Sequence, residues 1–257
     1  MNKITIVLPA YNEEENVEAL LIKWDQQRTL LEEEHGLGLR IVVVDDGSSD
    51  ETAAIVERRA EDDPGIILIR HTKNQGLGAG VRTGIGYFLD QCGDSPYLCI
   101  MDADNTQDPI YIGSMLEAIR NGNRHVVIAS RYRKGSQVEG VSPLRLAMSS
   151  GARLVFTVLL RVPGVRDYTC GYRLYERNKL QEAADRFGES LIEENGFTCM
   201  VELLYKLYCC GAVFAEIPFH LRYDRKLGSS KMSVARTAVR SVQLARRLKG
   251  FRKDSNA

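Results

Sequence analysis

Two carboxylates, Asp102 and Asp104, stand directly after the apolar run Tyr97–Met101. A strand that ends in this way can turn both side chains toward one hard divalent cation, whose other positions stay open for water and phosphate. Such a cation would offset the negative charge that builds on a departing diphosphate, so that a bond to a sugar anomeric carbon breaks without covalent help from the protein. A solvated turn is the alternative interpretation of this pair.

Polar segments also follow two other apolar runs. Ile4–Leu8 leads into Pro9–Glu13, and Arg40–Val44 leads into Asp45–Ser48. Because open α/β sheets bind ligands beyond the carboxyl ends of their strands, these ends predict one common site. The glycine-rich loop Asn74–Gly80 follows the third strand, not the first, so it does not fit the dinucleotide fingerprint. It predicts a tight loop with close helix packing, and a direct phosphate contact is the alternative.

The elements that would position these residues alternate through the first half of the chain. Apolar strands followed by helices predict parallel β-α-β units with helices on both faces of the sheet. The expected strands are Ile4–Leu8, Arg40–Val44, Ile66–Arg70, Tyr97–Met101 and His125–Ala129, and the expected helices are Glu13–Leu30, Glu51–Arg59, one after the glycine loop to about Leu89, and Pro109–Asn121.

The second half breaks this alternation. We expect, in order, a polar loop over Arg131–Ser142, a helix over Leu144–Leu160, a turn over Gly164–Gly171, a buried helix over Gly196–Cys210, a strand over Ala212–Ile217 and a final helix over Ser233–Leu248. No linker rich in Pro, Gly or Ser separates the halves, which predicts one compact unit.

Composition bounds the class of protein. The 257 residues are 44% hydrophobic and 26% charged, which is ordinary globular usage and excludes disorder and collagen. No run approaches the roughly 20 apolar residues of a membrane-spanning helix. Pro9 and Glu13–Glu15 interrupt the first apolar run before a signal-peptide core can form, so we expect a cytoplasmic protein. The six cysteines lack C-x-x-C spacing, which argues against zinc and for reduced, interior thiols.

The net charge of zero hides an asymmetry. From His220 onward the chain has eleven Lys and Arg residues against Asp224 and Asp254. A basic tail on an acidic body predicts an anionic partner, such as phosphates or a lipid surface, and a solvated helix face is the alternative. The tail lacks interleaved aromatic residues, which argues against nucleic acid.

Two helices could contact a membrane. On the final helix Arg236, Arg240 and Arg247 share one face, and the opposite face carries Val234, Ala235, Ala238, Val239, Val242 and Ala245. This helix either lies on an anionic bilayer or packs on the body with its arginines in water. The helix over Leu144–Leu160 is either buried core or a second interfacial patch.

Six motifs together identify a family. They are Leu8–Glu14, Val44–Asp50, Asn74–Gly78, Asp102–Asp104, Ser130–Tyr132 and Asp167–Arg173. The set resembles the family 2 inverting glycosyltransferases, most closely the dolichyl-phosphate and polyprenyl-phosphate mannosyl- and glucosyltransferases, over about residues 3–232. The resemblance implies an α/β fold of the GT-A (Rossmann-like) type, with a mixed, mostly parallel sheet sandwiched by helices. It also implies a catalytic domain over residues 1–219, followed by a basic loop and an amphipathic C-terminal helix over 220–257.

The resemblance also assigns roles by position. Asp102 and Asp104 would bind Mg²⁺ or Mn²⁺. Arg131 and Arg145 would face the donor and acceptor phosphates, a task suited to a planar bidentate donor. The nucleotide-sugar pocket would comprise Pro9, Tyr11, Glu13, Val44, Asp46, Asp102, Ala103, Asp104 and Arg131, with Arg225 and Lys231 on a loop that closes over the diphosphate. The chain departs from the subgroup after the metal motif, where Asn105 and Thr106 replace Leu-Gln and leave the third metal ligand and the donor sugar open.

The acceptor decides the mechanism. A lipid monophosphate is largely ionised near neutral pH because its second pKa is about 6, so it needs cations and no general base. A hydroxyl acceptor would need a base, for which Asp167 is the candidate, with a structural turn as the alternative. We therefore expect a catalytic set of Asp104, Arg131 and Asp167.

The expected function is transfer of a hexose from GDP-hexose or UDP-hexose to a polyprenyl phosphate, with inversion. We expect the enzyme to act peripherally at the inner membrane face and not to bind nucleic acid. One alternative is the same chemistry on a hydroxyl of a soluble, glycolipid or peptide acceptor. The other is a nucleotide-binding module without turnover.

Overall fold

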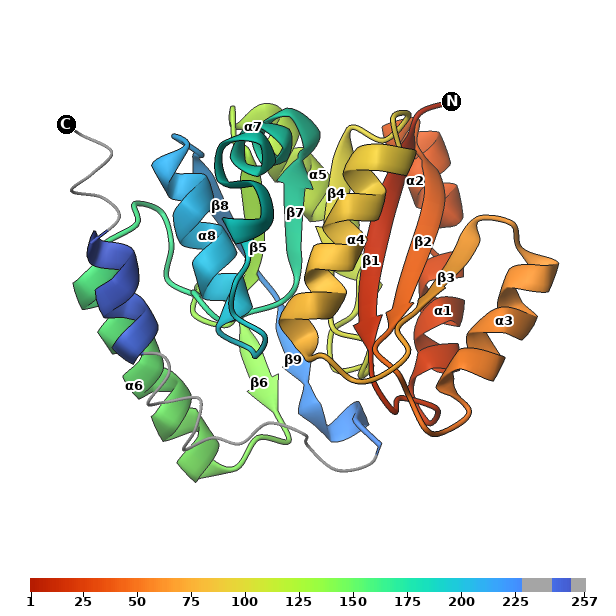
Figure 1. The fold of residues 1–257 in the computed structure, drawn as a ribbon, viewed down its shortest axis with the longest axis horizontal. Coiled ribbons are helices and arrows are strands. Elements are labelled where there is room, and N and C mark those ends of the chain that lie inside the picture. The colour runs from red at the N-terminus through yellow and green to blue at the C-terminus, as the bar shows by residue number, and fades with distance from the viewer. Residues whose placement is uncertain (228–241, 251–257) are drawn as a thin grey trace.

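A seven-stranded sheet forms the centre of the molecule, with the order β3-β2-β1-β4-β7-β5-β8 (Figure 1). The computed structural model describes residues 1–227 and 242–250, without the side chains of residues 143–148 and 152. The strands are β1 (Lys3–Ala10), β2 (Gly38–Asp45), β3 (Ile66–Arg70), β4 (Tyr97–Ile100), β5 (Val126–Ser130), β7 (Arg173–Glu176) and β8 (Phe214–Pro218). A small parallel sheet pairs β6 (Gln137–Glu139) with β9 (His220–Arg222).

The strand directions bring the polar strand ends to one edge. β1 runs parallel to β2 and β4, and its register pairs Pro9 with Val44 and Ala10 with Asp45. β7 is antiparallel to both β4 and β5, so β4 and β5 point the same way. The carboxyl ends of β1, β2, β4 and β5 therefore share an edge with the start of β7. This edge faces down in Figure 1.

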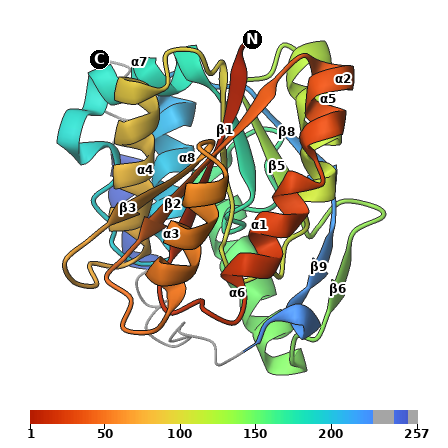
Figure 2. The ribbon, with the colours of Figure 1, turned by 90° about the vertical axis from the view of Figure 1, so that its right-hand side faces the viewer.

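Helices cover both faces of the sheet. In Figure 2 the sheet is seen between one layer with α4, α7 and α8 and another with α1, α2 and α5. The helices are α1 (Val17–Asp25), α2 (Arg28–His35), α3 (Thr52–Asp62), α4 (Leu77–Gln91), α5 (Ile112–Asn121), α6 (Pro143–Leu160), α7 (Arg177–Phe187) and α8 (Cys199–Cys209). Short 3-10 turns span Pro109–Tyr111, Gly188–Leu191 and Tyr223–Arg225. The sandwich confirms the α/β architecture that the apolar runs predicted.

The core lies between these layers. β1 and β2 are buried on both faces, which explains their nearly continuous apolar sequences. Trp24 on α1 is fully buried against this core. All six cysteines are free thiols, and five of them are buried.

The elements differ from the predictions in three places. The expected helix Glu13–Leu30 is two helices, α1 and α2, because the chain turns at Gln26 and Gln27 while the apolar spacing continues across the turn. β7 and α7 were not predicted. β7 was missed because its fully buried Arg173 makes the segment look polar, although that side chain donates to the carbonyls of Met200 and Tyr168. The loop expected over Arg131–Ser142 contains β6.

The two helices considered for membrane contact differ in their packing. On α6, Phe156 is fully buried while Leu154 and Val158 are exposed, so the helix has both a core side and an exposed apolar side. The C-terminal helix spans 242–250 in the described part, where Leu244 and Leu248 are buried. The earlier part of the helix expected over Ser233–Leu248 lies outside the described residues.

Arg247 of this C-terminal helix pairs with Glu194 and Glu202 at 3.1 and 3.0 Å. These contacts match the alternative in which the helix packs on the body, except that Arg247 forms ion pairs where water was expected. Among the described residues no helix is long and apolar enough to cross a membrane. The division at residues 219 and 220 stays a prediction.

Glycines let α4 approach β1 closely, which yields a matched pair of variants. An added Cβ at Gly84 would lie 2.3 Å from Cγ1 of Val7, whereas one at Gly86 would meet nothing within 4 Å. We expect Gly84→Ala to lower the free energy of unfolding by about 1–3 kcal/mol through overpacking. Gly86→Ala in the same helix should raise it by about 0.5–1 kcal/mol through helix propensity. Urea denaturation measures both, and equal effects of the two variants would contradict this packing.

Candidate active site

The loop after β4 presents Asp102 and Asp104 at the shared edge of the sheet. Gln107 Nε2 donates to Oδ2 of Asp102 at 2.6 Å, and Thr106 Oγ1 donates to Oδ1 of Asp104 at 2.7 Å. A Cβ at Gly171, just before β7, would lie 2.8 Å from Oδ1 of Asp102. A larger residue at this position would therefore displace the carboxylate. The structure thus holds both carboxylates in place from neighbouring segments.

The departure after the metal motif has a structural counterpart. Asn105 has a φ of 60°, a conformation that asparagine tolerates better than most residues. Its Oδ1 accepts a hydrogen bond from Lys23 Nζ at 2.6 Å, which ties this loop to α1. Thr106 and Gln107, and not a residue at position 105, contact the two carboxylates. Gln107 stands only three residues after Asp104, and this proximity was the sequence signal for its contact with Asp102. Comparison of motifs did not detect it.

Negative charge accumulates at this pair. Burial raises the pKa of Asp102 to about 7, and the charge of Asp104 adds to the effect while Lys226 and Arg131 oppose it. Lys226 Nζ lies 2.7 Å from Oδ2 of Asp104 and 3.9 Å from Oε1 of Glu13. Burial alone would lower the pKa of Lys226, but Asp104 raises it above its usual value. The two carboxylates therefore attract cationic groups.

Residues 223–227 bring Lys226 to this place. Arg225 Nη1 pairs with Oδ2 of Asp108 at 2.8 Å. Leu227 exchanges two hydrogen bonds with the side-chain amide of Asn16, each of 3.1 Å. Sequence reasoning selected Arg225 and missed its neighbour Lys226, although both stand in the same basic segment. Lys231, the other residue predicted for this loop, lies outside the described residues.

Asp46 is engaged with the glycine loop. Its carboxylate accepts hydrogen bonds from the backbone N–H groups of Gln75 and Gly76 at 3.0 and 2.7 Å, and Oδ1 lies 2.7 Å from Nδ1 of His71. The other ring nitrogen of His71 lies 2.9 Å from Oγ1 of Thr83. Asp46 thus connects the end of β2 to the start of α4. Sequence reasoning missed His71, which has no motif around it.

The glycine loop packs as predicted. A Cβ at Gly78 would lie 1.8 Å from the carbonyl oxygen of Glu194, and one at Gly76 would lie 2.4 Å from that of Asn195. Gly78 N–H also donates to the Asn195 carbonyl at 3.0 Å. The prediction of a tight loop with close packing is confirmed for these two glycines.

The remaining residues predicted for the nucleotide pocket differ in exposure. Pro9 and Tyr11 are partly exposed at the end of β1, and Glu13 lies beside Lys226. Val44 and Ala103 are buried, Val44 completely. The structure therefore brings Glu13 close to the metal motif, whereas the Val44 side chain belongs to the core.

Arg131 and Asp167 form a bidentate pair beside this cluster. Nε and Nη2 of Arg131 donate to the two oxygens of Asp167 at 2.8 and 2.6 Å. The backbone N–H groups of Arg131, Thr169 and Cys170 donate to the same carboxylate at 3.0, 3.3 and 3.1 Å. Burial alone would raise the pKa of Asp167, but the charge and hydrogen bonds of Arg131 lower it below its usual value.

This arrangement bears on the predicted base. A general base needs an available lone pair and a pKa near the working pH. Asp167 is fully buried, accepts hydrogen bonds from three residues and has a lowered pKa. The hydrogen bonds from the backbone of Thr169 and Cys170 match the alternative of a structural turn. Asp167 also orients Arg131, and its role in catalysis stays a prediction. Arg145, the second predicted phosphate ligand, lies on α6, and its side chain is outside the part of the chain that the structure describes.

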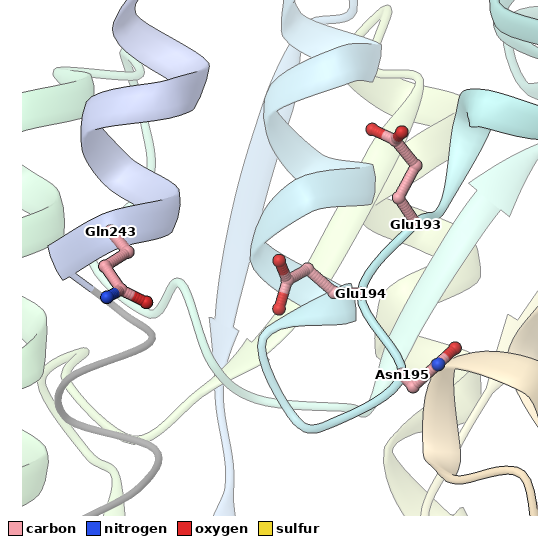
Figure 3. Close-up of a pocket in the computed structure, with 4 residues that line it drawn as sticks. All are labelled: Glu193, Glu194, Asn195 and Gln243. Carbon is pink, nitrogen blue, oxygen red and sulfur yellow. The ribbon is translucent and has the colours of Figure 1, made fainter.

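A separate pocket of about 230 Å³ lies between the C-terminal helix and the loop before α8 (Figure 3). It is lined by Glu193, Glu194, Asn195 and Gln243. Two carboxylates and two amides offer no cation to a diphosphate. The pocket contains none of the predicted site residues, and we do not place the donor there.

Comparison with known proteins agrees with the motifs. Residues 5–183 match the family model for glycosyl transferase family 2. A polyprenol monophosphomannose synthase from Mycolicibacterium smegmatis is 32% identical over 89% of this chain and 80% of its own length. An undecaprenyl-phosphate mannosyltransferase from Micrococcus luteus is 30% identical over 97% and 98%. A dolichol-phosphate mannosyltransferase from Pyrococcus furiosus is 32% identical over 90% of this chain, which spans 59% of that relative.

Solved structures show the same fold. Glucosyl-3-phosphoglycerate synthase from Mycobacterium tuberculosis, in complex with Mn²⁺, UDP and glucosyl-3-phosphoglycerate, superposes with a TM-score of 0.65. The match covers 95% of this chain and 80% of that one at 17% identity. The GT-A fold expected from the motifs is confirmed.

The buried pair of Arg131 and Asp167 predicts a pH-dependent loss of stability. Because the pKa of Asp167 is lower in the folded state than its unfolded value of about 3.9, its stabilisation is complete above that pH and is lost as the pH falls through the folded pKa. Asp167→Asn should therefore cost about 3 kcal/mol of unfolding free energy near neutral pH. The difference from wild type should shrink below about pH 4.

Chemical denaturation at several pH values measures this difference. Asp185→Asn, a change of an exposed carboxylate on α7, is the matched control and should leave stability unchanged. A difference that stayed constant down to about pH 2 would contradict the ion pair.

Proposed function

The chain belongs to glycosyl transferase family 2, and on that premise we propose that it transfers a hexose from a nucleotide diphosphate sugar to a polyprenyl phosphate with inversion. One observation carries the proposal: the carboxylates Asp102 and Asp104 and the cation Arg131 lie at the same edge of one sheet. One relative is named as a polyprenol monophosphomannose synthase and two as mannosyltransferases of dolichol phosphate or undecaprenyl phosphate. These names favour mannose as the sugar.

Asp102 and Asp104 would hold Mg²⁺ or Mn²⁺. The donor set fits, since carboxylate oxygens suit a hard cation, and burial together with the charge of Asp104 raises the pKa of Asp102. When bound, the metal would neutralise charge on the leaving diphosphate. Gln107 and Thr106 orient the two carboxylates for this task.

The basic residues of this chain would handle the phosphates. Lys226 lies against Asp104 and can donate to a diphosphate that binds beside this carboxylate. Arg225, the residue before Lys226, supplies a second cation near the loop after β4. Arg131, fixed by Asp167, would receive the acceptor phosphate and hold its oxygen opposite the leaving group, as inversion requires.

A phosphate nucleophile explains why the site needs no general base. The acceptor is largely ionised at neutral pH because its second pKa is about 6. The carboxylate oxygens of Asp167 accept hydrogen bonds from Arg131 and from backbone N–H groups. A carboxylate engaged in this way is better suited to orient a cation than to abstract a proton. For a hydroxyl acceptor, Asp167 would be a poor general base.

We place the reaction at the inner, cytoplasmic face of a membrane, with the protein bound peripherally. A polyprenyl acceptor is anchored in lipid, and the eleven Lys and Arg residues from His220 onward favour an anionic surface. The donor is GDP-linked or UDP-linked, and the metal is Mg²⁺ or Mn²⁺.

A transfer assay tests the function directly. The full chain is incubated with GDP-mannose or UDP-glucose, Mg²⁺ or Mn²⁺, and a short-chain polyprenyl phosphate or the matching polyprenol. We expect release of nucleoside diphosphate and a lipid-linked hexose of inverted configuration with the phosphate only. Transfer to the polyprenol or to a soluble hydroxyl instead would contradict the acceptor, and no turnover with any donor would favour a binding module.

The metal motif makes a separate prediction. Donor binding should stabilise the wild-type protein by about 2.7 kcal/mol at about 100 times Kd, and only with a divalent cation present. Asp104→Asn should abolish this metal-dependent shift in thermal unfolding, because it removes one of two anionic ligands. Asp90→Asn, which changes an exposed carboxylate on α4, should keep it. A full shift in Asp104→Asn would show that the metal binds elsewhere.

A further inference from the structure

Two arginines contact one aromatic ring beside the site. Cζ of Arg131 lies 5.5 Å from the ring centroid of Tyr132, and Cζ of Arg153, on α6, lies 4.4 Å from the same centroid. The Tyr132 hydroxyl is hydrogen-bonded to Oγ of Ser149 on α6 at 2.8 Å. The end of β5 and the middle of α6 are thus joined through Tyr132, and Arg153 is brought into the neighbourhood of Arg131.

The charge of Arg131 is already balanced within the protein. Its guanidinium pairs with Asp167 at 2.6 Å, so the two formal charges cancel. Arg133, the next arginine along the chain, likewise pairs with Glu216 at 2.9 Å. A phosphate monoester carries nearly two negative charges at neutral pH. The pair of Arg131 and Asp167 can orient such a group through hydrogen bonds but adds no net positive charge to meet it.

Arg153 has no such balance. Within residues 1–227 and 242–250 no carboxylate forms an ion pair with it, and its guanidinium lies over the face of the Tyr132 ring. A guanidinium that stacks on an aromatic face directs its N–H groups outward in its own plane, where they can donate to an anion. The ring therefore fixes the position of Arg153 without neutralising its charge.

We propose that Arg153 binds the phosphate of the acceptor and supplies the net positive charge that the Arg131–Asp167 pair lacks. This inference rests on the proposed function, because it takes the acceptor to be a lipid monophosphate. Tyr132 acts as a positioning residue that sets the distance of Arg153 from Arg131. The ligand class is a phosphate monoester, and its source is the polyprenyl acceptor and not the headgroups of the surrounding bilayer.

Steady-state kinetics on three variants test the inference. Arg153→Gln removes the charge and keeps much of the length, Arg153→Lys keeps the charge without the planar group, and Arg161→Gln removes an exposed charge just beyond α6 as the matched control. Each protein is assayed in detergent free of phospholipid, with a short-chain polyprenyl phosphate as acceptor and the matching polyprenol as a competing inhibitor.

We expect Arg153→Gln to raise the KM for the polyprenyl phosphate about tenfold, the size expected for one charge-assisted hydrogen bond. The donor KM, the inhibition constant of the uncharged polyprenol and the melting temperature should stay at wild-type values. Arg153→Lys should recover part of the acceptor affinity, and Arg161→Gln should match wild type. A purely structural role for Arg153 would instead change kcat, donor KM and melting temperature together.

Several results would overturn the inference. An unchanged acceptor KM in Arg153→Gln would remove Arg153 from the acceptor site and leave the proposed function intact. If Arg153→Gln weakened binding to phosphatidylglycerol vesicles while the acceptor KM in detergent stayed the same, Arg153 would bind headgroups instead. A wild-type enzyme that transferred hexose only to hydroxyl acceptors would overturn both this inference and the proposed function.

Discussion

Repulsion between Asp102 and Asp104 is the interaction on which the rest of the site depends. Burial and the neighbouring charge together raise the pKa of Asp102 to about 7, so the ionised pair is unstable without positive charge nearby. Lys226 supplies part of that charge, and Gln107 supplies a neutral donor. A divalent cation would satisfy the remainder, which is why the same loop suits a metal and, through it, a diphosphate.

One antiparallel strand combines two strand ends into a single site. β7 (Arg173–Glu176) runs against β4 and β5, so the segment that precedes it arrives where those strands end. Gly171 then lies against Asp102, and Asp167 lies against Arg131. The anionic half of the site after β4 and the cationic half after β5 are positioned by the same short segment. A fully parallel sheet would have placed that segment at the opposite edge.

Internal ion pairs decide which basic residues bring net positive charge to this surface. The tail has eleven Lys and Arg residues, yet Arg247 pairs with Glu194 and Glu202, and Lys226 pairs with Asp104. Arg131 is neutralised by Asp167 in the same way. Arg153, held on an aromatic face, keeps its charge for a ligand. Paired cations can therefore meet a phosphate through hydrogen bonds, whereas Arg153 also adds net charge.

The sequence by itself determined the α/β class, most strands, the three polar strand ends and the family, because apolar runs and motifs are written in adjacent residues. Only the tertiary structure decided that the first long helix is two, that a strand containing buried Arg173 enters the sheet, and that Lys226 contacts the metal motif. It also decided that Asp167 holds Arg131. These outcomes depend on which charged side chains, distant in the sequence, come into contact and which become buried. Strand order determines these contacts, whereas local residue spacing does not.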